Sequence, residues 1–314
     1  MPTLKKEVKL SGRGIHSGCP VNIVVRPSDK SGIFFVRTDM AGSMPIAARF
    51  DNVGDTKMRN TTVGCTCGAH VQTVEHLMAA LFMVGVDSAV IEIDGPETPI
   101  LDGSAALFID AFRKAGVTDG CMKKIVVRRP VVARAADVRR TLPMGLRFKL
   151  WVMDLISGRR ADGYVKLEPG SDDALDISAT LIYREKIIGN QTYEYKFDGT
   201  KKSVDTFVRD IARARTFGKY SEWEYLKAHG MGRGADETNV IALNDAGDGT
   251  LNNLIWPDEF VRHKIIDAVG DMATSGGMIV GRLTSYKGSH AMNNIVLKKL
   301  FSDVRNYDII DCEK

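Results

Sequence analysis

Apolar residues recur with strand and helix spacings, in a similar order in both halves of the chain. In the first half, two predicted helices (73–84 and 104–116) accompany the predicted strands VNIVVRP (21–27), GIFFVRT (32–38) and AVIEID (89–94). The second half contains the predicted strands KKIVVRRPVV (123–132), LRFKLWVM (146–153), ALDISATLIY (174–183) and TYEYKF (192–197). After these strands come a predicted helix at 203–214, the strand VIAL (240–243) and a helix from Asp258.

This repeated order predicts an α+β fold with two similar domains, each a β-sheet layered with α-helices. No residue-level repeat accompanies it, so the duplication is a hypothesis about topology. We expect the first domain to span residues 1–124 and the second to span 125–314. The boundary follows DGCMKK (119–124), where turn-forming residues give way to a new strand.

The helix in DEFVRHKIIDAVGDM (258–272) has two unlike faces. At about 100° per residue, one face is apolar and is made of Val261, Ile265, Ala268 and Met272. The opposite face carries His263, Asp267, Gly270 and Asp271, with Lys264 beside them. A solvent-exposed polar side is the ordinary explanation, but such a side usually carries Glu and Lys pairs and no glycine, which costs roughly 1 kcal/mol relative to alanine in a helix. The second face is therefore a candidate functional surface.

Composition excludes several classes of protein. With 314 residues, 44% of them hydrophobic, the chain is long enough for two ordinary domains. Its longest apolar runs, such as SAVIEI (88–93), have the length of a strand, so we expect no transmembrane segment. A net charge of +4 without a run of five basic residues predicts at most an anionic ligand, and no nucleic-acid partner.

The five cysteines are odd in number and scattered along the chain. We therefore expect no disulfide framework, with Cys65 and Cys67 as plain buried thiols, and a reducing cytoplasm as the setting. The start of the sequence, MPTLKKEVKL, resembles no secretion signal, which also favours the cytoplasm.

Two helices together offer three ligands for a metal ion. Thr73 is a possible N-cap, so Glu75 and His76 fall in the first turn of the helix at 73–84. The positive end of the helix dipole there favours an ionised Glu75 and the neutral imidazole that binds metals. His76, with His263 and Asp267 at i and i+4 of the other helix, would leave a fourth position for water, as in a catalytic zinc site.

Further residues could complete such a site. Glu75 adjoins a predicted ligand and could accept a proton from water. Asp271 lies one turn beyond Asp267 and could orient another histidine. The candidate is His290 in SYKGSHAMNN (285–294), although a histidine in a turn is often only a surface residue.

Five segments resemble the signatures of one enzyme family, in that family's order. They are VEHLMAAL, LDGSAALF, ARARTFG, DEFVRHKIIDAVGD and YKGSHAMNN, and SGRGIHSG (11–18) near the start adds to them. The family is the zinc-dependent UDP-3-O-acyl-N-acetylglucosamine deacetylase of Gram-negative lipid A biosynthesis. The resemblance implies two α+β domains whose helices face each other across the active site, and hydrolysis of the N-acetyl group of a UDP-linked, acylated N-acetylglucosamine. It implies one zinc ion per chain, and we expect a monomer.

The resemblance also implies roles for individual residues. It implies zinc ligands at His76, His263 and Asp267, the set that the helix geometry already proposes. Glu75 matches the general base and His290, supported by Asp271, the positively charged histidine. Thr216 matches an oxyanion-stabilising threonine, while Phe217 and Lys264 match positions that contact the substrate, the lysine through the diphosphate.

The chain departs from the family where the acyl passage is expected. Lys219 stands where an apolar or aromatic residue is common, Arg233 adds charge to a Gly-rich segment, and residues 139–160 look like an added hairpin. Two alternatives therefore stay open: a zinc deacetylase of a related N-acetyl sugar, and a metal-binding protein without catalysis. Iron(II) is also possible, because two histidines and one carboxylate bind it in oxygenases.

Overall fold

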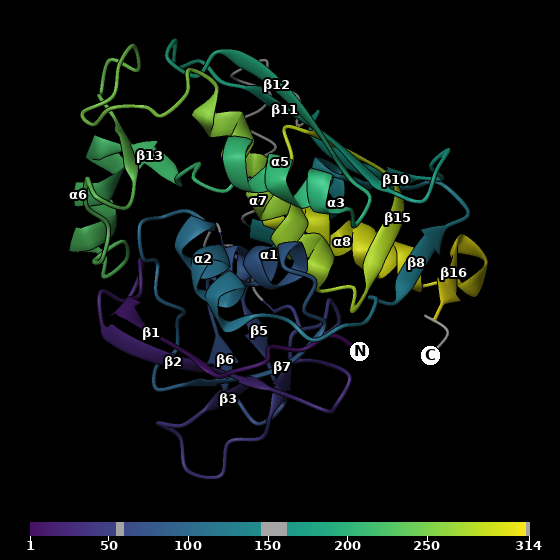
Figure 1. Cartoon of the computed structure of the whole chain (residues 1–314). Coiled ribbons are helices and arrows are strands. Elements are labelled where there is room, and N and C mark those ends of the chain that lie inside the picture. Colours follow the sequence, from purple (N-terminus) through teal and green to yellow (C-terminus); the bar gives the residue numbers. More distant parts are fainter. Residues whose placement is uncertain (55–59, 146–161, 312–314) are drawn as a thin grey trace.

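The computed structural model describes residues 1–54, 60–145 and 162–311. Two β-sheets form the outer layers, and helices from both halves of the chain lie between them (Figure 1). This arrangement confirms the predicted α+β fold, with helices facing each other in the middle of the molecule. The domain boundary after residue 124 stays a prediction.

The first sheet contains five strands in the order β1-β2-β7-β3-β4. They are β1 (Val8–Arg13), β2 (Pro20–Pro27), β3 (Gly32–Arg37), β4 (Ile46–Ala47) and β7 (Ser88–Ile93). Buried residues alternate along β3, as expected for a strand with one face on a core. The helices α1 (Glu75–Met83) and α2 (Ala106–Ala115) lie on this sheet, and a hairpin of β5 (Val63–Gly64) and β6 (His70–Val71) precedes α1.

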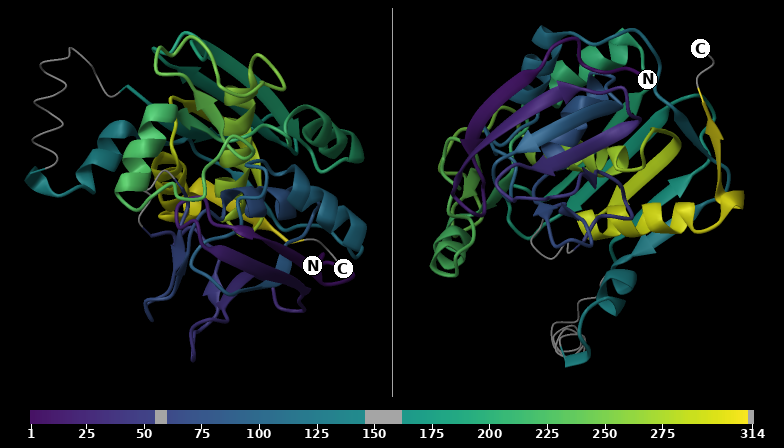
Figure 2. Two further views of the ribbon diagram at one scale, coloured as in Figure 1. Left: turned by 90° about the vertical axis from the view of Figure 1, so that its left-hand side faces the viewer. Right: turned by 90° about the horizontal axis from the view of Figure 1, so that it is seen from below.

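The second sheet has the order β12-β11-β15-β10-β9, and β8 joins it by pairing with both β15 and β16. Its strands are β8 (Lys124–Val127), β9 (Val131–Arg134), β10 (Tyr164–Glu168), β11 (Leu175–Ile182), β12 (Asn190–Phe197), β15 (Met278–Tyr286) and β16 (Tyr307–Ile310). The helices packed with this sheet include α3 (Ala135–Arg140), α5 (Lys201–Asp210), α7 (Glu259–Ala273), α8 (His290–Phe301) and the short 3-10 helix η1 (Val304–Asn306). Figure 2 shows the two sheets and the helices between them from two further sides.

Helices α1 and α7 pack directly against each other, and this contact explains both faces of α7. The predicted apolar stripe is buried, with Val261 and Ile265 fully inaccessible in one core that includes residues of both sheets. The polar face is buried as well, because it turns toward α1. A Cβ atom at Gly270 would lie 2.0 Å from the carbonyl oxygen of Glu75, so only glycine permits this approach of the two backbones.

A smaller unit lies beside the two sheets. In it β13 (Phe217–Lys219) pairs in parallel with β14 (Ile241–Leu243), and α6 (Tyr220–Ala228) follows β13 directly. Four buried residues make an apolar cluster separate from the main core: Trp223, Ala235, Val240 and Ala242. Figure 1 places α6 and β13 at the edge of the molecule, away from β16.

Two predictions about local structure are wrong. Thr73 does not cap α1, because the helix begins after Val74. The backbone of Thr73 has a φ of 58°, and the Thr73 hydroxyl bonds to Asn60 and Glu97 instead. Cys65 and Cys67 are not buried thiols, because the turn between β5 and β6 brings their Cα atoms within 5.2 Å and they form a disulfide. Cys67 is exposed.

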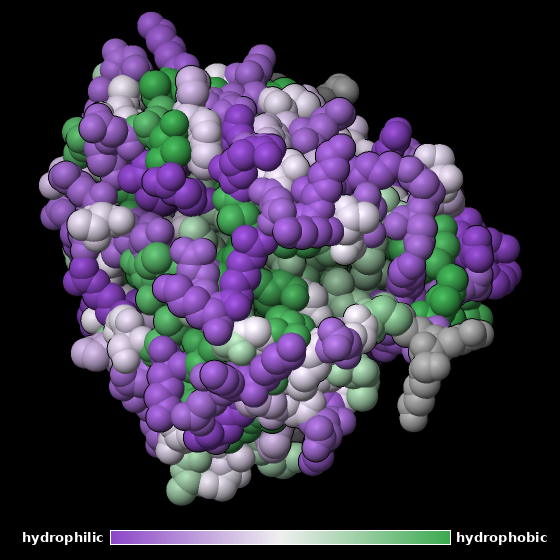
Figure 3. All heavy atoms as spheres, viewed as in Figure 1, coloured by the Kyte–Doolittle hydropathy of each residue, from purple (hydrophilic) through white to green (hydrophobic). Residues whose placement is uncertain are grey.

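Other predictions fall partly outside the described residues. The strand expected at 146–153 and most of the hairpin expected at 139–160 lie there, while residues 135–140 form α3. Among the described residues, the helices are all too short or too polar to span a membrane. On the face seen in Figure 3, hydrophilic side chains cover most of the surface and hydrophobic ones form smaller patches between them.

Candidate metal centre and active site

The three predicted metal ligands come together where α1 meets α7. His76 lies in the first turn of α1, and His263 and Asp267 lie one turn apart on α7. Their potential ligand atoms all lie within 4.8 Å of one another, and all three residues are buried. The Nε2 atoms of His76 and His263 lie 3.7 and 3.4 Å from Oδ1 of Asp267.

The surroundings of these residues fit a metal ion. Nδ1–H of His263 donates to the carbonyl oxygen of Ala214 at 3.0 Å, which orients the ring and leaves Nε2 free to bind a metal. Burial lowers the pKa of His263 to about 3, so the imidazole is neutral. Burial alone would raise the pKa of Asp267, but Lys264 and the histidines hold it well below its usual value. Two neutral imidazoles and one carboxylate are a common donor set for zinc.

Glu75 lies beside His76 as an unusually buried carboxyl group. Its side chain is almost inaccessible, and Oε2 accepts a hydrogen bond from the backbone N–H of Thr61 at 2.9 Å. Burial raises the pKa of Glu75 above its ordinary value, which makes the carboxylate a better proton acceptor.

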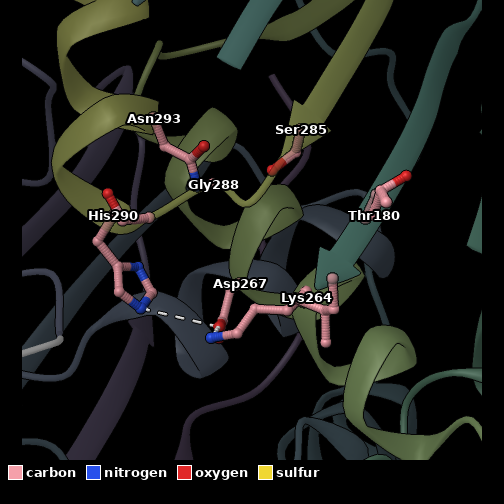
Figure 4. Close-up of a pocket in the computed structure, with 10 residues that line it drawn as sticks. Thr180, Lys264, Asp267, Ser285, Gly288, His290 and Asn293 are labelled. Carbon is pink, nitrogen blue, oxygen red and sulfur yellow. Dashed lines mark hydrogen bonds and ion pairs between the residues drawn. The ribbon is translucent and has the colours of Figure 1, made fainter. Parts of the chain in front are cut away.

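His290 and Asp271 form a buried pair close to the candidate ligands. His290 is the first residue of α8, and its Nδ1–H donates to Oδ2 of Asp271 at 2.8 Å. Burial alone would lower the pKa of His290, but Asp271 and Asp267 raise it to about 10, so the ring carries a proton near neutral pH. Its Nε2 lies 3.8 Å from Oδ2 of Asp267, the contact dashed in Figure 4.

A cleft of about 540 Å³ opens onto this cluster. Thr216, Phe217 and Lys264 line it together with Glu75 and the three candidate metal ligands. The ammonium group of Lys264 lies 2.6 Å from Oδ2 of Asp267 and 5.4 Å above the ring of Phe217. Farther along, the walls are largely apolar and include Ile100, Ile188, Trp223, Leu226, Val240 and Leu243. The nine predicted site residues therefore occupy one region, eight of them on the cleft and Asp271 directly behind His290.

Comparison with known proteins shows the family of this chain. The sequence model of the UDP-3-O-acyl N-acetylglycosamine deacetylase family matches residues 1–302. The chain belongs to this family. Three relatives are each named UDP-3-O-acyl-N-acetylglucosamine deacetylase: those of Myxococcus xanthus (36% identical over 99% of this chain and 90% of the relative), Geotalea uraniireducens (37%, 96% and 88%) and Neisseria meningitidis serogroup C (34%, 98% and 92%).

Two residues of this deacetylase site were missed by the sequence analysis. Asn293 donates to Oδ2 of Asp271 at 2.8 Å, and it could have been found because it lies three residues after His290 on the same helix. Thr61 donates its hydroxyl to Oδ1 of Asp271 and lies 3.2 Å from Nδ1 of His290. No motif or spacing around Thr61 indicates this role.

The two charged residues that depart from the family pattern, Lys219 and Arg233, lie in different surroundings. Lys219 is on the cleft, where its ammonium group pairs with Glu185 at 2.6 Å. Arg233 is exposed on the segment between α6 and β14, whose backbone packs on residues 15–16. The cleft therefore contains an ion pair among its apolar walls.

Proposed function

We propose that this protein hydrolyses the N-acetyl group of UDP-3-O-acyl-N-acetylglucosamine, giving UDP-3-O-acyl-glucosamine and acetate, the committed step of lipid A biosynthesis. One observation carries the proposal: a buried His-His-Asp set lies next to a buried carboxyl group and a charged histidine, on an apolar cleft, in a member of this deacetylase family. Each of these parts has a use in cleaving an amide.

We propose His76, His263 and Asp267 as the ligands of one zinc ion per chain. When bound, zinc polarises the amide carbonyl and lowers the pKa of water to about 7. Iron(II) suits the same ligands and is the alternative occupant. Lys264 contacts a ligand carboxylate and adds a positive charge at the metal site.

Glu75 acts as the general base. It takes a proton from the water that attacks the acetyl carbonyl, a transfer for which a raised carboxyl pKa is suited. The hydrogen bond from Thr61 holds one carboxylate oxygen, and the other stays available for the proton. The attacking oxygen then forms a bond to the carbonyl carbon, and negative charge develops on the carbonyl oxygen.

Thr216 and His290 serve the following steps. The hydroxyl of Thr216 stabilises the developing oxyanion as a hydrogen-bond donor. His290, kept protonated by Asp271, gives its Nε2 proton to the sugar nitrogen as the C–N bond breaks, so that the amine leaves neutral and acetate stays behind.

Substrate recognition falls to the rest of the cleft. We propose that Lys264 binds the diphosphate, that Phe217 packs against the substrate and that the apolar walls hold the acyl chain. The nine proposed residues form the site without a residue from a second copy, so the proposed reaction needs only a monomer. We propose a cytoplasmic location because the substrate is UDP-linked. The number and spacing of the cysteines support that location less, since Cys65 and Cys67 form a disulfide.

A second candidate keeps this chemistry and changes the sugar or its acyl chain. The ion pair between Lys219 and Glu185 favours it, since a charged pair beside an acyl chain limits the apolar surface available for binding. A metal-binding protein without catalysis would give no use to Glu75 and to the protonated His290.

The test is deacetylation of UDP-3-O-acyl-N-acetylglucosamine by the purified protein, with and without a chelator. We expect turnover that the chelator abolishes and added zinc restores. His263→Ala should lower metal affinity by more than the roughly 10- to 100-fold that removal of a supporting contact costs, because it removes a ligand itself. His229→Ala, at an exposed histidine away from the cleft, is the matched control. Full zinc occupancy in His263→Ala would contradict the site, and absence of turnover in the zinc-loaded wild type would contradict the reaction.

A further inference from the structure

Thr61 lies where three helices meet, although it belongs to none of them. It is 2% exposed and stands just before β5. Its carbonyl oxygen accepts from the backbone N–H of Val74 at 3.2 Å, and its own N–H donates to Oε2 of Glu75 at 2.9 Å. The backbone of Thr61 is thus bound to the beginning of α1 and to the proposed general base.

The side chain of Thr61 contacts residues of two other helices, α7 and α8. Its hydroxyl donates to Oδ1 of Asp271 on α7 and lies 3.2 Å from Nδ1 of His290 on α8. The other oxygen of Asp271, Oδ2, accepts from His290 and Asn293, both at 2.8 Å. Thr61, His290 and Asn293 therefore fix the plane of this buried carboxylate from both of its oxygens.

We propose that Thr61 is a positioning residue that holds both proton-transferring groups in one fixed arrangement. Its backbone N–H orients Glu75, while its hydroxyl orients Asp271 and, through Asp271, the ring of His290. The inference rests on the proposed function, in which Glu75 removes a proton and His290 supplies one. Because one residue contacts both groups, a change in its position would disturb both proton transfers.

A purely structural role makes a different prediction. A buried carboxylate oxygen that loses its donor destabilises the folded state, so many substitutions of Thr61 would lower the melting temperature whatever the residue does. A positioning role requires in addition that kcat falls while KM and zinc content stay the same, and that the fall depends on His290.

The first experiment compares substitutions of neighbouring threonines. Thr61→Val keeps the shape and the backbone N–H but removes the hydroxyl, and Thr61→Ala is a second variant with room for a water molecule should valine not fold. We expect kcat to fall roughly 10- to 100-fold in both, the usual effect of removing a supporting contact at a metal site. Thr61→Ser should restore most of the activity. Thr62→Val is the matched control, because the Thr62 hydroxyl bonds only Asn60 among the described residues.

The second experiment asks whether the effect passes through His290. In the His290→Gln background, Thr61→Val should cause little further loss, since residues that act through one another are not additive. The same loss in both backgrounds, or wild-type kcat in Thr61→Val, would overturn the proposal. So would an equal loss in Thr61→Ser, because the hydroxyl would then be irrelevant.

A spectroscopic measurement decides the question without substrate. In protein labelled with ¹⁵N-histidine and loaded with zinc, the Nδ1 proton of His290 should give a low-field resonance that is absent in His290→Gln. We expect this resonance to shift in Thr61→Val and Thr61→Ala and to stay in place in Thr62→Val. An unmoved resonance in both hydroxyl-free variants contradicts the role of Thr61, whereas a wild type that is inert toward the UDP-sugar contradicts the proposed function alone.

Discussion

The two walls of the cleft are built differently. Helices α1, α7 and α8 belong to the main core, and the ionisable groups that they place around the metal site are buried and joined by hydrogen bonds or ion pairs. In the wall made by β13, β14 and α6, Ile241 and Leu243 of β14 belong to the main core. The rest of this wall packs around a separate cluster of four residues, and Phe217 and Lys219 on it are partly exposed. The proposed ionisable groups thus sit on helices of the main core, and of the proposed catalytic residues only Thr216, directly before β13, belongs to the other wall.

This difference predicts how substitutions act. A change on the wall of α1, α7 and α8 should alter the chemical step, because it disturbs groups held at fixed distances. A change on the wall of β13, β14 and α6 should alter substrate preference and leave the chemical step intact.

The largest effect is expected at Glu75. Glu75→Ala should lower kcat at least about 100-fold, since a positioned proton acceptor contributes around 10²- to 10⁴-fold, and zinc should stay bound. Steady-state kinetics with metal analysis of the same sample checks this. Glu237→Ala, at an exposed glutamate, is the control. Near-normal turnover in Glu75→Ala would show that another group accepts the proton.

The pH dependence of kcat should be bell-shaped. Activity rises with pH as Glu75 loses its proton, and the raised pKa of Glu75 places this limb above the ordinary range of glutamate. Activity falls again when His290 loses its proton, with a pKa of about 10. In His290→Gln the alkaline limb should disappear or move, and rates measured between acidic and strongly alkaline pH test this. If the alkaline limb is the same in wild type and His290→Gln, a group other than His290 titrates there.

An intermediate effect is expected at Lys264, between the two walls. Lys264→Ala should raise KM by about 10-fold, as for loss of a hydrogen bond to a charged group, and should lower kcat less. The lysine contacts Asp267, so zinc content is measured on the same sample. A fall in kcat with unchanged KM would show that Lys264 serves the metal site and does not bind the diphosphate.

The smallest effect is expected at Lys219. Replacing the pair with Lys219→Phe and Glu185→Gln should change kcat/KM for long acyl chains on the order of a few-fold, because partly exposed ion pairs contribute about 0.2–1 kcal/mol. Substrates of graded chain length reveal the change, and the shortest chain is the internal control. If the chain-length preference does not move, Lys219 lies outside the acyl passage.

The sequence predicts the three residues that the structure brings together as candidate metal ligands, because their signal is local. His263 and Asp267 follow helix spacing, and His76 begins a helix with a clear apolar pattern. The pairing of His290 with Asp271 was also predicted, from the distance of one turn between Asp267 and Asp271 and from the family resemblance. These side chains are positioned by regular elements whose geometry is known in advance.

The remaining features depend on contacts that no local pattern records. Thr61 is 210 residues from Asp271 and 229 from His290, and its segment has no periodicity. Thr73 was assigned as a cap from residue type alone, but its contacts with Asn60 and Glu97 take precedence over that local preference. The disulfide between Cys65 and Cys67 lies in the turn of a hairpin whose strands have only two residues each, and apolar patterning does not indicate strands that short.

Gly270 has no functional group, yet the mechanism depends on it. A methyl group there would meet the carbonyl oxygen of Glu75 at 2.0 Å, so any larger residue must push α1 away from α7. His76 and Asp267, which sit on these two helices, would then be drawn apart. In a library of random substitutions, position 270 should therefore tolerate as few residues as the positions that bind the metal.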